Sequence, residues 1–196
     1  MEHSEVRSTV LFVPGLRDHV PDHWQTLLAA EIKGSRTVPP LEEDKLSCAA
    51  RVEALDRAIR EIEGAPILVA HSAGVLMVAH WAQRHARPIQ AALLATPPDI
   101  SRPLPAGYPT PEQLEAGGWL PVPRERLPFA SLVCASANDL LASAASAGDL
   151  AQAWGSRLVN LGEVGHLNPV AGYGPWPTAH RLIVELEADD TAKGAA

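Results

Sequence analysis

Residues 65–81, APILVAHSAGVLMVAHW, decide the fold of this chain. They combine a short apolar run, a turn in which Ser72 stands among small residues, and apolar spacing typical of a helix. A serine on a strand-to-helix turn of this kind is the pattern of a nucleophile elbow. We therefore expect Ser72 to project above a sheet, beside the first amides of the helix. A plain tight turn would give the same short pattern, so the remaining sequence has to distinguish the two.

Length and composition limit the class of protein. The 196 residues predict one domain, over residues 1–188, and a disordered tail at 189–196. A net charge of −7 and the lack of a basic cluster give no footprint for nucleic acid, and no apolar stretch reaches the roughly 20 residues of a membrane span. We expect neither nucleic acid nor a membrane as partner. The charged N-terminus lacks a signal-peptide core and predicts a cytoplasmic protein.

Apolar runs alternate with helical patterns along the chain. Around the elbow, strands are predicted at 9–13, 36–38, 90–95, 129–135 and 157–160, and helices at 24–32, 47–63, 144–154 and 178–187. We expect Asp22 to cap the first helix and Gly34 to end it. This rhythm predicts the α/β class, as a Rossmann-like three-layer sandwich in which helices cover both faces of a mostly parallel sheet.

Residues 97–128 interrupt that rhythm. They hold nine of the eighteen prolines, which excludes a long helix there. We expect an ordered excursion that covers a site, and the sequence leaves open whether it is a mobile lid.

Catalysis at Ser72 would require a histidine base, because a serine hydroxyl is a weak nucleophile at neutral pH. In this kind of fold the chain order is serine, acid, histidine. His166 follows the last predicted strand in the loop Gly162-Glu163-Val164-Gly165-His166, at the same sheet edge as Ser72. His166 is therefore the expected base.

The acid should also follow a strand, and Asp139 does so in the loop after 129–135. Asp99, after an earlier strand, is its competitor. Helix capping is the alternative role for Asp139.

An oxyanion hole would need two backbone amides. Ala73 supplies one at the start of the helix, and Leu16, after Pro14-Gly15, is the expected second donor. Gly15 would permit close approach and a positive φ.

Metal and redox chemistry find little support. His19 and His23 are four residues apart, but Pro21 between them prevents a continuous helix and no third ligand is evident. Cys48 and Cys134 have the surroundings of core or boundary residues. We expect no metal and no cofactor.

Four parts of the sequence carry a resemblance. They are Val13-Pro14-Gly15-Leu16, Pro21-Asp22-His23-Trp24-Gln25, His71-Ser72-Ala73-Gly74, and Gly165-His166-Leu167-Asn168 with Gly174-Pro175-Trp176-Pro177. Over nearly its whole length the chain is similar to the small serine hydrolases of the α/β-hydrolase superfamily related to retinoblastoma-binding protein 9. The resemblance implies a compact hydrolase core in which Ser72, Asp139 and His166 are nucleophile, acid and base. Two positions depart from the family pattern: Ala70 stands where glycine is usual, and Asn138 precedes the expected acid.

These residues predict a serine hydrolase, and more narrowly a carboxylesterase that acts on small acyl esters through an acyl-enzyme intermediate. Gly15, Leu16, Trp119, Leu167 and Trp176 are predicted to shape its pocket, since they lie on connections next to the expected site. The main alternative is a noncatalytic protein of the same fold that binds a protein or small molecule. A metal-dependent hydrolase is a more distant alternative. The oligomeric state is left open, with a homodimer as one alternative.

Overall fold

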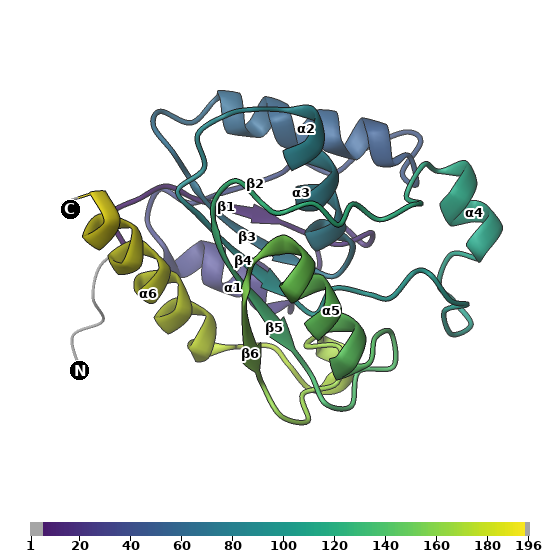
Figure 1. Ribbon diagram of the computed structural model, residues 1–196. Coiled ribbons are helices and arrows are strands. Elements are labelled where there is room, and N and C mark those ends of the chain that lie inside the picture. The colour runs from purple at the N-terminus through teal and green to yellow at the C-terminus, as the bar shows by residue number, and fades with distance from the viewer. Residues whose placement is uncertain (1–5, 195–196) are drawn as a thin grey trace.

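The computed structural model describes residues 6–194 (Figure 1). Residues 1–5 and 195–196, with part of the charged N-terminal segment and the end of the predicted tail, lie outside the described residues. Six parallel strands form one sheet in the order β2-β1-β3-β4-β5-β6. They are β1 (Val10–Val13), β2 (Arg36–Thr37), β3 (Ile67–His71), β4 (Ala91–Ala95), β5 (Ala130–Ala135) and β6 (Arg157–Asn160).

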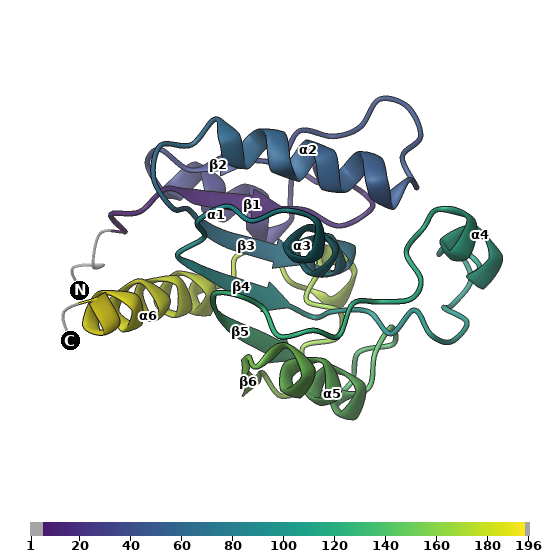
Figure 2. The same ribbon diagram turned by 45° about the horizontal axis from the view of Figure 1, so that its top comes forward.

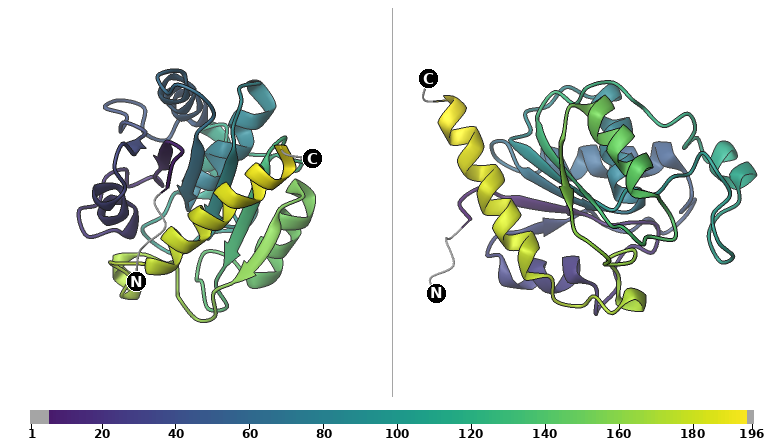
Figure 3. Two further views of the ribbon diagram at one scale, coloured as in Figure 1. Left: turned by 90° about the vertical axis from the view of Figure 1, so that its left-hand side faces the viewer. Right: turned by 60° about the horizontal axis from the view of Figure 1, so that its bottom comes forward.

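Helices cover both faces of this sheet. They are α1 (Trp24–Glu31), α2 (Cys48–Arg60), α3 (Ala73–Arg84), α5 (Ala144–Trp154) and α6 (Pro177–Gly194). The short helix α4 (Pro111–Ala116) stands apart from the sheet (Figure 1), and a 3₁₀ turn lies at Pro169–Ala171. Helices α2, α3 and α5 pack on one face, and α1 and α6 pack on the other (Figures 2 and 3). Because both faces are covered, β1, β3 and β4 are buried at every position and apolar except for His71 at the end of β3, as the runs in the sequence predicted.

The register of the strands gathers their carboxyl ends at one edge. Val13 pairs with Ala70, and the end of β3 at His71 pairs with Ala95 of β4. The amide of Ser72 continues this ladder by donating to the carbonyl of Ala95 at 3.0 Å. The first residues after β1, β3, β4 and β5 are thereby brought to the same end of the sheet.

Gly74 fixes how α3 packs on that edge. A Cβ atom added at Gly74 would lie 2.2 Å from the carbonyl oxygen of Val13 and 2.8 Å from that of Pro14. The first turn of α3 therefore lies directly against the end of β1. Only a residue without a side chain permits this approach, which brings the turn at Ser72 beside the loop after β1.

Several elements differ from their predicted form. The excursion at 97–128 contains the short helix α4, whose N-cap Thr110 and Gln113 form a reciprocal capping box. The N-cap of α1 is His23 rather than Asp22, because the His23 ring nitrogen accepts the amide hydrogen of Gln25. Helix α6 runs on to Gly194, so the described part of the tail predicted to be disordered is helical.

In the part of the chain that the structure describes, no helix has the length and apolar character needed to cross a membrane.

The close approach at Gly74 predicts a large cost for adding one methyl group. Gly74→Ala should lower the free energy of unfolding by about 3 kcal/mol or more, because the backbone of β1 would have to shift. Gly148→Ala is the matched control: it lies within α5, where a Cβ would meet only a Leu158 methyl at 3.7 Å. That change should raise stability by about 0.5–1 kcal/mol. Urea denaturation measures both, and equal effects of the two substitutions would contradict the packing described.

Candidate active site

Ser72 lies at the turn between β3 and α3 with an unusual backbone. Its φ of 57° and ψ of −129° are outside the regions that side-chain-bearing residues normally adopt. Its side chain does not cap α3. The strained turn instead directs the hydroxyl toward the carboxyl edge of the sheet, where the other candidate residues lie.

His166 connects Ser72 to Asp139. Its Nε2 is 2.8 Å from the Ser72 Oγ, and its Nδ1 is 2.8 Å from the Asp139 Oδ2. Because a carboxylate only accepts hydrogen bonds, Nδ1 carries the proton and Nε2 is free to accept the serine hydrogen. The Asp139 side chain is 2% exposed and that of His166 is 9% exposed. This arrangement can remove a proton from Ser72 and return it to a departing group.

The loops that carry Asp139 and His166 are tied to each other. Asn138 accepts hydrogen bonds from the Ser136 hydroxyl at 3.0 Å and from the Gly165 amide at 2.6 Å. Ser136 in turn accepts the amide hydrogen of Val164 at 3.2 Å. Asn138 thus fixes the residue next to His166, which gives a physical role to the position that departs from the family pattern.

Asp139 is also held from its own loop, since the amide of Leu141 donates to its other carboxylate oxygen at 2.8 Å. Asp99 lies elsewhere: its carboxylate accepts hydrogen bonds from Ser101 and pairs with Arg102. The structure therefore brings Asp139, and not its competitor, to His166.

Two further histidine rings, those of His71 and His23, pack in series next to His166. His71 donates its Nε2 hydrogen to the backbone carbonyl of His166 at 2.9 Å, and the two rings lie 5.0 Å apart. The ring of His23 lies 4.6 Å from that of His71. Burial, and then the proximity of His166, lower the pKa of His23 to about 4 and that of His71 well below its usual range. Both rings are therefore neutral near pH 7.

The loop after β1 lies against Ser72. A Cβ atom added at Gly15 would stand 3.2 Å from the Ser72 Cβ and 3.5 Å from its Oγ. Gly15 is not among the residues with positive φ, so close approach alone accounts for glycine there, and the expected positive φ is wrong. Leu16 and Ala73, whose amides are the expected oxyanion donors, both line the space next to Ser72.

A cavity of about 520 Å³ opens beside Ser72. Of the predicted pocket residues, Gly15, Leu16 and Trp119 line it. Leu167 and Trp176 do not: both are buried in the apolar cluster beneath α1 and α6, where Trp176 packs edge-on against Trp24 at 4.8 Å. Those two assignments are corrected: the Leu167 side chain is fully buried in that cluster, the chain lines the cavity again at Asn168–Val170, and Trp176 packs against α1.

Sequence reasoning missed Asn138 and His71 as supporting residues. The sequence marks Asn138 only as a departure from the family pattern, and His71 only as part of the motif around Ser72. A polar residue next to an expected catalytic position was the available signal in both cases.

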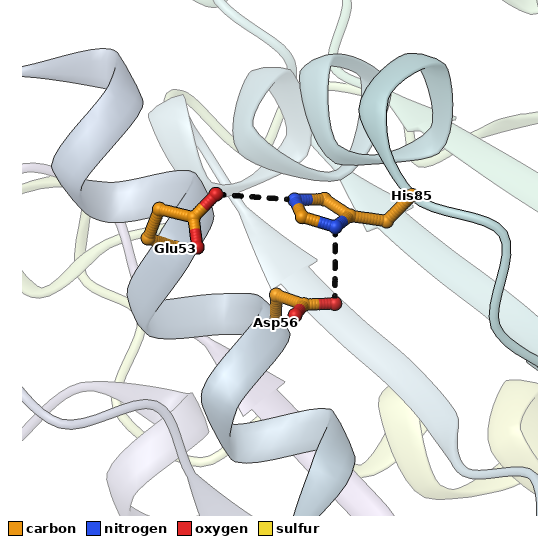
Figure 4. A group of neighbouring side chains, drawn as sticks. All are labelled: Glu53, Asp56 and His85. Atoms are coloured by element: carbon orange, nitrogen blue, oxygen red, sulfur yellow. Dashed lines mark ion pairs between the residues drawn. The ribbon is translucent and has the colours of Figure 1, made fainter.

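Within the described residues, one group of acidic and histidine side chains could hold a metal: Glu53, Asp56 and His85 (Figure 4). It lies at the opposite end of α3 from Ser72 and does not include His19 or His23. The fully buried Asp56 already accepts hydrogen bonds from Arg60, Arg87 and Trp81. Burial by itself would raise the pKa of Asp56, but these donors hold it below its usual range. A cation there would face two guanidinium groups.

The two cysteines are buried and unpaired. Burial raises the pKa of Cys48 to about 11 and that of Cys134 to about 12, so both thiols stay protonated near pH 7.

Comparisons with known proteins identify a family and similar structures. A family model described as serine hydrolase matches residues 10–185. A YdeN-like hydrolase from Pectobacterium atrosepticum is 30% identical, with a TM-score of 0.79 over 93% of this chain and 91% of the other. A search of curated proteins found no significant match.

Two further solved structures are similar in fold alone. The ydeN gene product of B. subtilis is 16% identical, with a TM-score of 0.65 over 92% of this chain and 99% of the other. Est1E from Butyrivibrio proteoclasticus, solved with ferulic acid bound, is 12% identical, with a TM-score of 0.70 over 94% and 90%.

The lowered pKa of His23 predicts a pH-dependent stability. Between the unfolded value of 6.5 and the folded value of about 4, the unfolded chain binds more protons at His23 than the native protein does. The free energy of unfolding should therefore be retained above pH 6.5 and fall as the pH falls from 6.5 to 4. His23→Asn keeps a capping acceptor but cannot titrate, so it should reduce this fall in urea denaturation series and leave the share of the buried His71, whose pKa is lowered in the same direction.

His19→Asn is the control, since it removes an exposed histidine from the same loop. It should keep the wild-type pH profile. An equal flattening in both variants would contradict the role of the buried ring.

Proposed function

Because this chain belongs to the serine hydrolase family and has the predicted compact α/β-hydrolase fold, we propose that it is a carboxylic ester hydrolase with Ser72 as its nucleophile. One observation carries this proposal: His166 joins Ser72 to Asp139 through two hydrogen bonds of 2.8 Å. Structural neighbours described as esterases support it at the level of fold.

In the proposed reaction, the Ser72 Oγ attacks the ester carbonyl while its proton passes to the Nε2 of His166. The carbonyl oxygen becomes an oxyanion, which the amides of Leu16 and Ala73 stabilise together with the positive end of α3. His166 then gives its proton to the departing alcohol, leaving an acyl group on Ser72. Water activated by the same ring releases the acid and restores the hydroxyl.

Asp139 has two effects in this scheme. Its hydrogen bond keeps the proton of His166 on Nδ1, and its negative charge stabilises the imidazolium that forms. His71 would hold the backbone of the same residue in place.

The residues that line the cavity support placing the leaving group on one side of it and the acyl group on the other. The leaving group must lie where His166 can protonate it, beside Asn168, Pro169 and Val170. The acyl group would then lie on the other side. Its apolar wall is formed by α3, the excursion with α4, and the segment before α2, through Leu46, Leu76, Ile100, Leu104, Leu114 and Trp119.

The polar atoms of that wall are already satisfied. The indole of Trp119 donates to the carbonyl of Leu46 at 2.7 Å, and His80 donates to the carbonyl of Trp119 at 3.1 Å. The wall therefore offers a substrate apolar surface, and we propose esters of small, apolar acyl groups as the substrate class.

Two finer expectations from the sequence remain predictions: kinship with the retinoblastoma-binding protein 9 family and a cytoplasmic location. The oligomeric state stays open, with a homodimer as one alternative. A noncatalytic binding protein remains the alternative. Such a protein would have no need for a serine, a histidine and a carboxylate that are joined by hydrogen bonds.

Labelling with a fluorophosphonate probe tests the function. The wild-type protein should be labelled at one residue, and Ser72→Ala should abolish labelling. Asp139→Asn should slow it by orders of magnitude, since loss of the orienting carboxylate costs about 10⁴ in kcat in a serine protease. Asp99→Asn removes a carboxylate that does not contact His166 and should leave the rate near wild type. Labelling that persists in Ser72→Ala would exclude Ser72 as the nucleophile.

Hydrolysis of p-nitrophenyl esters of increasing chain length tests the acyl side. Each methylene should contribute at most about 0.8 kcal/mol, so kcat/KM should rise to a short or medium chain and fall by palmitate, when the wall is reached. Leu114→Ala should move this optimum to longer chains because the shorter side chain enlarges the pocket. Val170→Ala, on the His166 side, should not move it. A steady rise to palmitate in the wild type would contradict the closed wall but not the role of Ser72.

A further inference from the structure

We propose that Arg51 is a positioning residue that holds the loop of residues 14–18 so that the amide of Leu16 points at the reacting carbonyl. This inference rests on the proposed function. Arg51 projects from α2, and its side chain is 3% exposed. It donates to the carbonyl of Leu16 at 3.2 Å, to the carboxylate of Asp18 at 2.9 Å and to the carbonyl of Lys45 at 2.7 Å.

The geometry of one peptide group links Arg51 to the oxyanion hole. The carbonyl of Gly15 and the amide of Leu16 belong to the same planar unit and point in opposite directions. The carbonyl of Gly15 accepts the amide hydrogen of Asp18 at 3.1 Å, which fixes one end of this unit. The other end is then directed away from the turn, and Gly15 lies close to the Ser72 hydroxyl.

Asp18 closes this turn with a φ of 53°, in the left-handed region. Aspartate tolerates that conformation better than most residues with a side chain, so the turn can form and its carboxylate is left to be fixed by a partner. The guanidinium of Arg51 holds its carboxylate, and at the same time holds the carbonyl of Leu16 on the next peptide unit. Arg51 thus holds the peptide group after Leu16 directly, and it holds the peptide group before Leu16 through Asp18, whose amide binds the carbonyl of Gly15.

The Arg51–Asp18 pair is better explained by the positioning of the loop of residues 14–18 than by a contribution to the free energy of unfolding. The two side chains are 3% and 11% exposed, and apolar residues of similar size often stabilise a protein as well as a buried ion pair does. Arg51 does not line the cavity beside Ser72, whereas Leu16 and Asp18 do. Arg51 thus acts through the loop and not on the substrate.

The test compares Arg51→Met with Arg60→Met. Both variants replace an arginine of α2 that pairs with an aspartate. The partner of Arg60 is Asp56, which is also in α2 and lies beside the end of α3 that is distant from Ser72. The measurements are kcat and KM on a p-nitrophenyl ester, inhibition by an alkyl trifluoromethyl ketone, and melting temperature. The ketone forms a tetrahedral oxyanion on a catalytic serine, so its affinity reports on the hole.

Arg51→Met should lower kcat about 10²-fold, the cost of losing one oxyanion donor, with little change in KM. The same substitution should lower the affinity for the ketone by a similar factor. Arg60→Met should leave kcat and ketone affinity unchanged even if its melting temperature falls. If Arg51→Met melts lower but keeps wild-type kcat and ketone affinity, the positioning role is wrong.

Asp18→Asn keeps the test decisive if Arg51→Met does not fold. Asparagine tolerates the left-handed conformation but loses the charge that Arg51 contacts, so kcat and ketone affinity should fall together by a smaller factor. Wild-type values for both in that variant would overturn the proposal. A wild-type protein that neither hydrolyses the ester nor binds the ketone would instead overturn the proposed function.

Discussion

The close contact between the first turn of α3 and the end of β1 is the constraint on which the site depends. Gly74 lies so near the carbonyl oxygens of Val13 and Pro14 that no side chain fits. This contact brings the Ser72 turn against the loop after β1, where Gly15 passes next to the serine side chain. The nucleophile and the second oxyanion donor thus come from different strands but share one point of backbone contact. The strain at Ser72 is tolerated because β3, β4 and α3 hold the turn from three sides.

The acid and the base are held by a separate set of interactions. Parallel strands bring the loops after β5 and β6 to the same edge as Ser72, and Asn138 and Ser136 then tie these loops together. His71 fixes the backbone of His166 from the strand that precedes the nucleophile. Each of the three side chains in the hydrogen-bonded series is therefore positioned by backbone groups or by neighbouring polar side chains.

Much of this could be predicted from the sequence, and the fold prediction is confirmed. Strands covered on both faces are continuously apolar, so they were visible as runs, and strand order along the chain placed the serine, acid and histidine at one edge. Trp176 was misplaced because proximity to His166 in sequence does not tell which face of the sheet the next residues reach. The prolines of residues 97–128 exclude a long helix but not the short helix α4, for which Pro111 at the first helical position and the Thr110–Gln113 box are start signals. The contacts of Arg51 and Asn138 join segments distant in sequence, and no local pattern reports them.

The central claim is that Ser72 carries the acyl group during turnover. Rapid mixing with excess p-nitrophenyl acetate, followed by acid quenching and peptide mass spectrometry, measures this directly. The account predicts a burst of p-nitrophenol approaching one equivalent of protein and a single acetylated residue, Ser72. Continued hydrolysis with no acetylated peptide, or acetylation only at another residue, would contradict it.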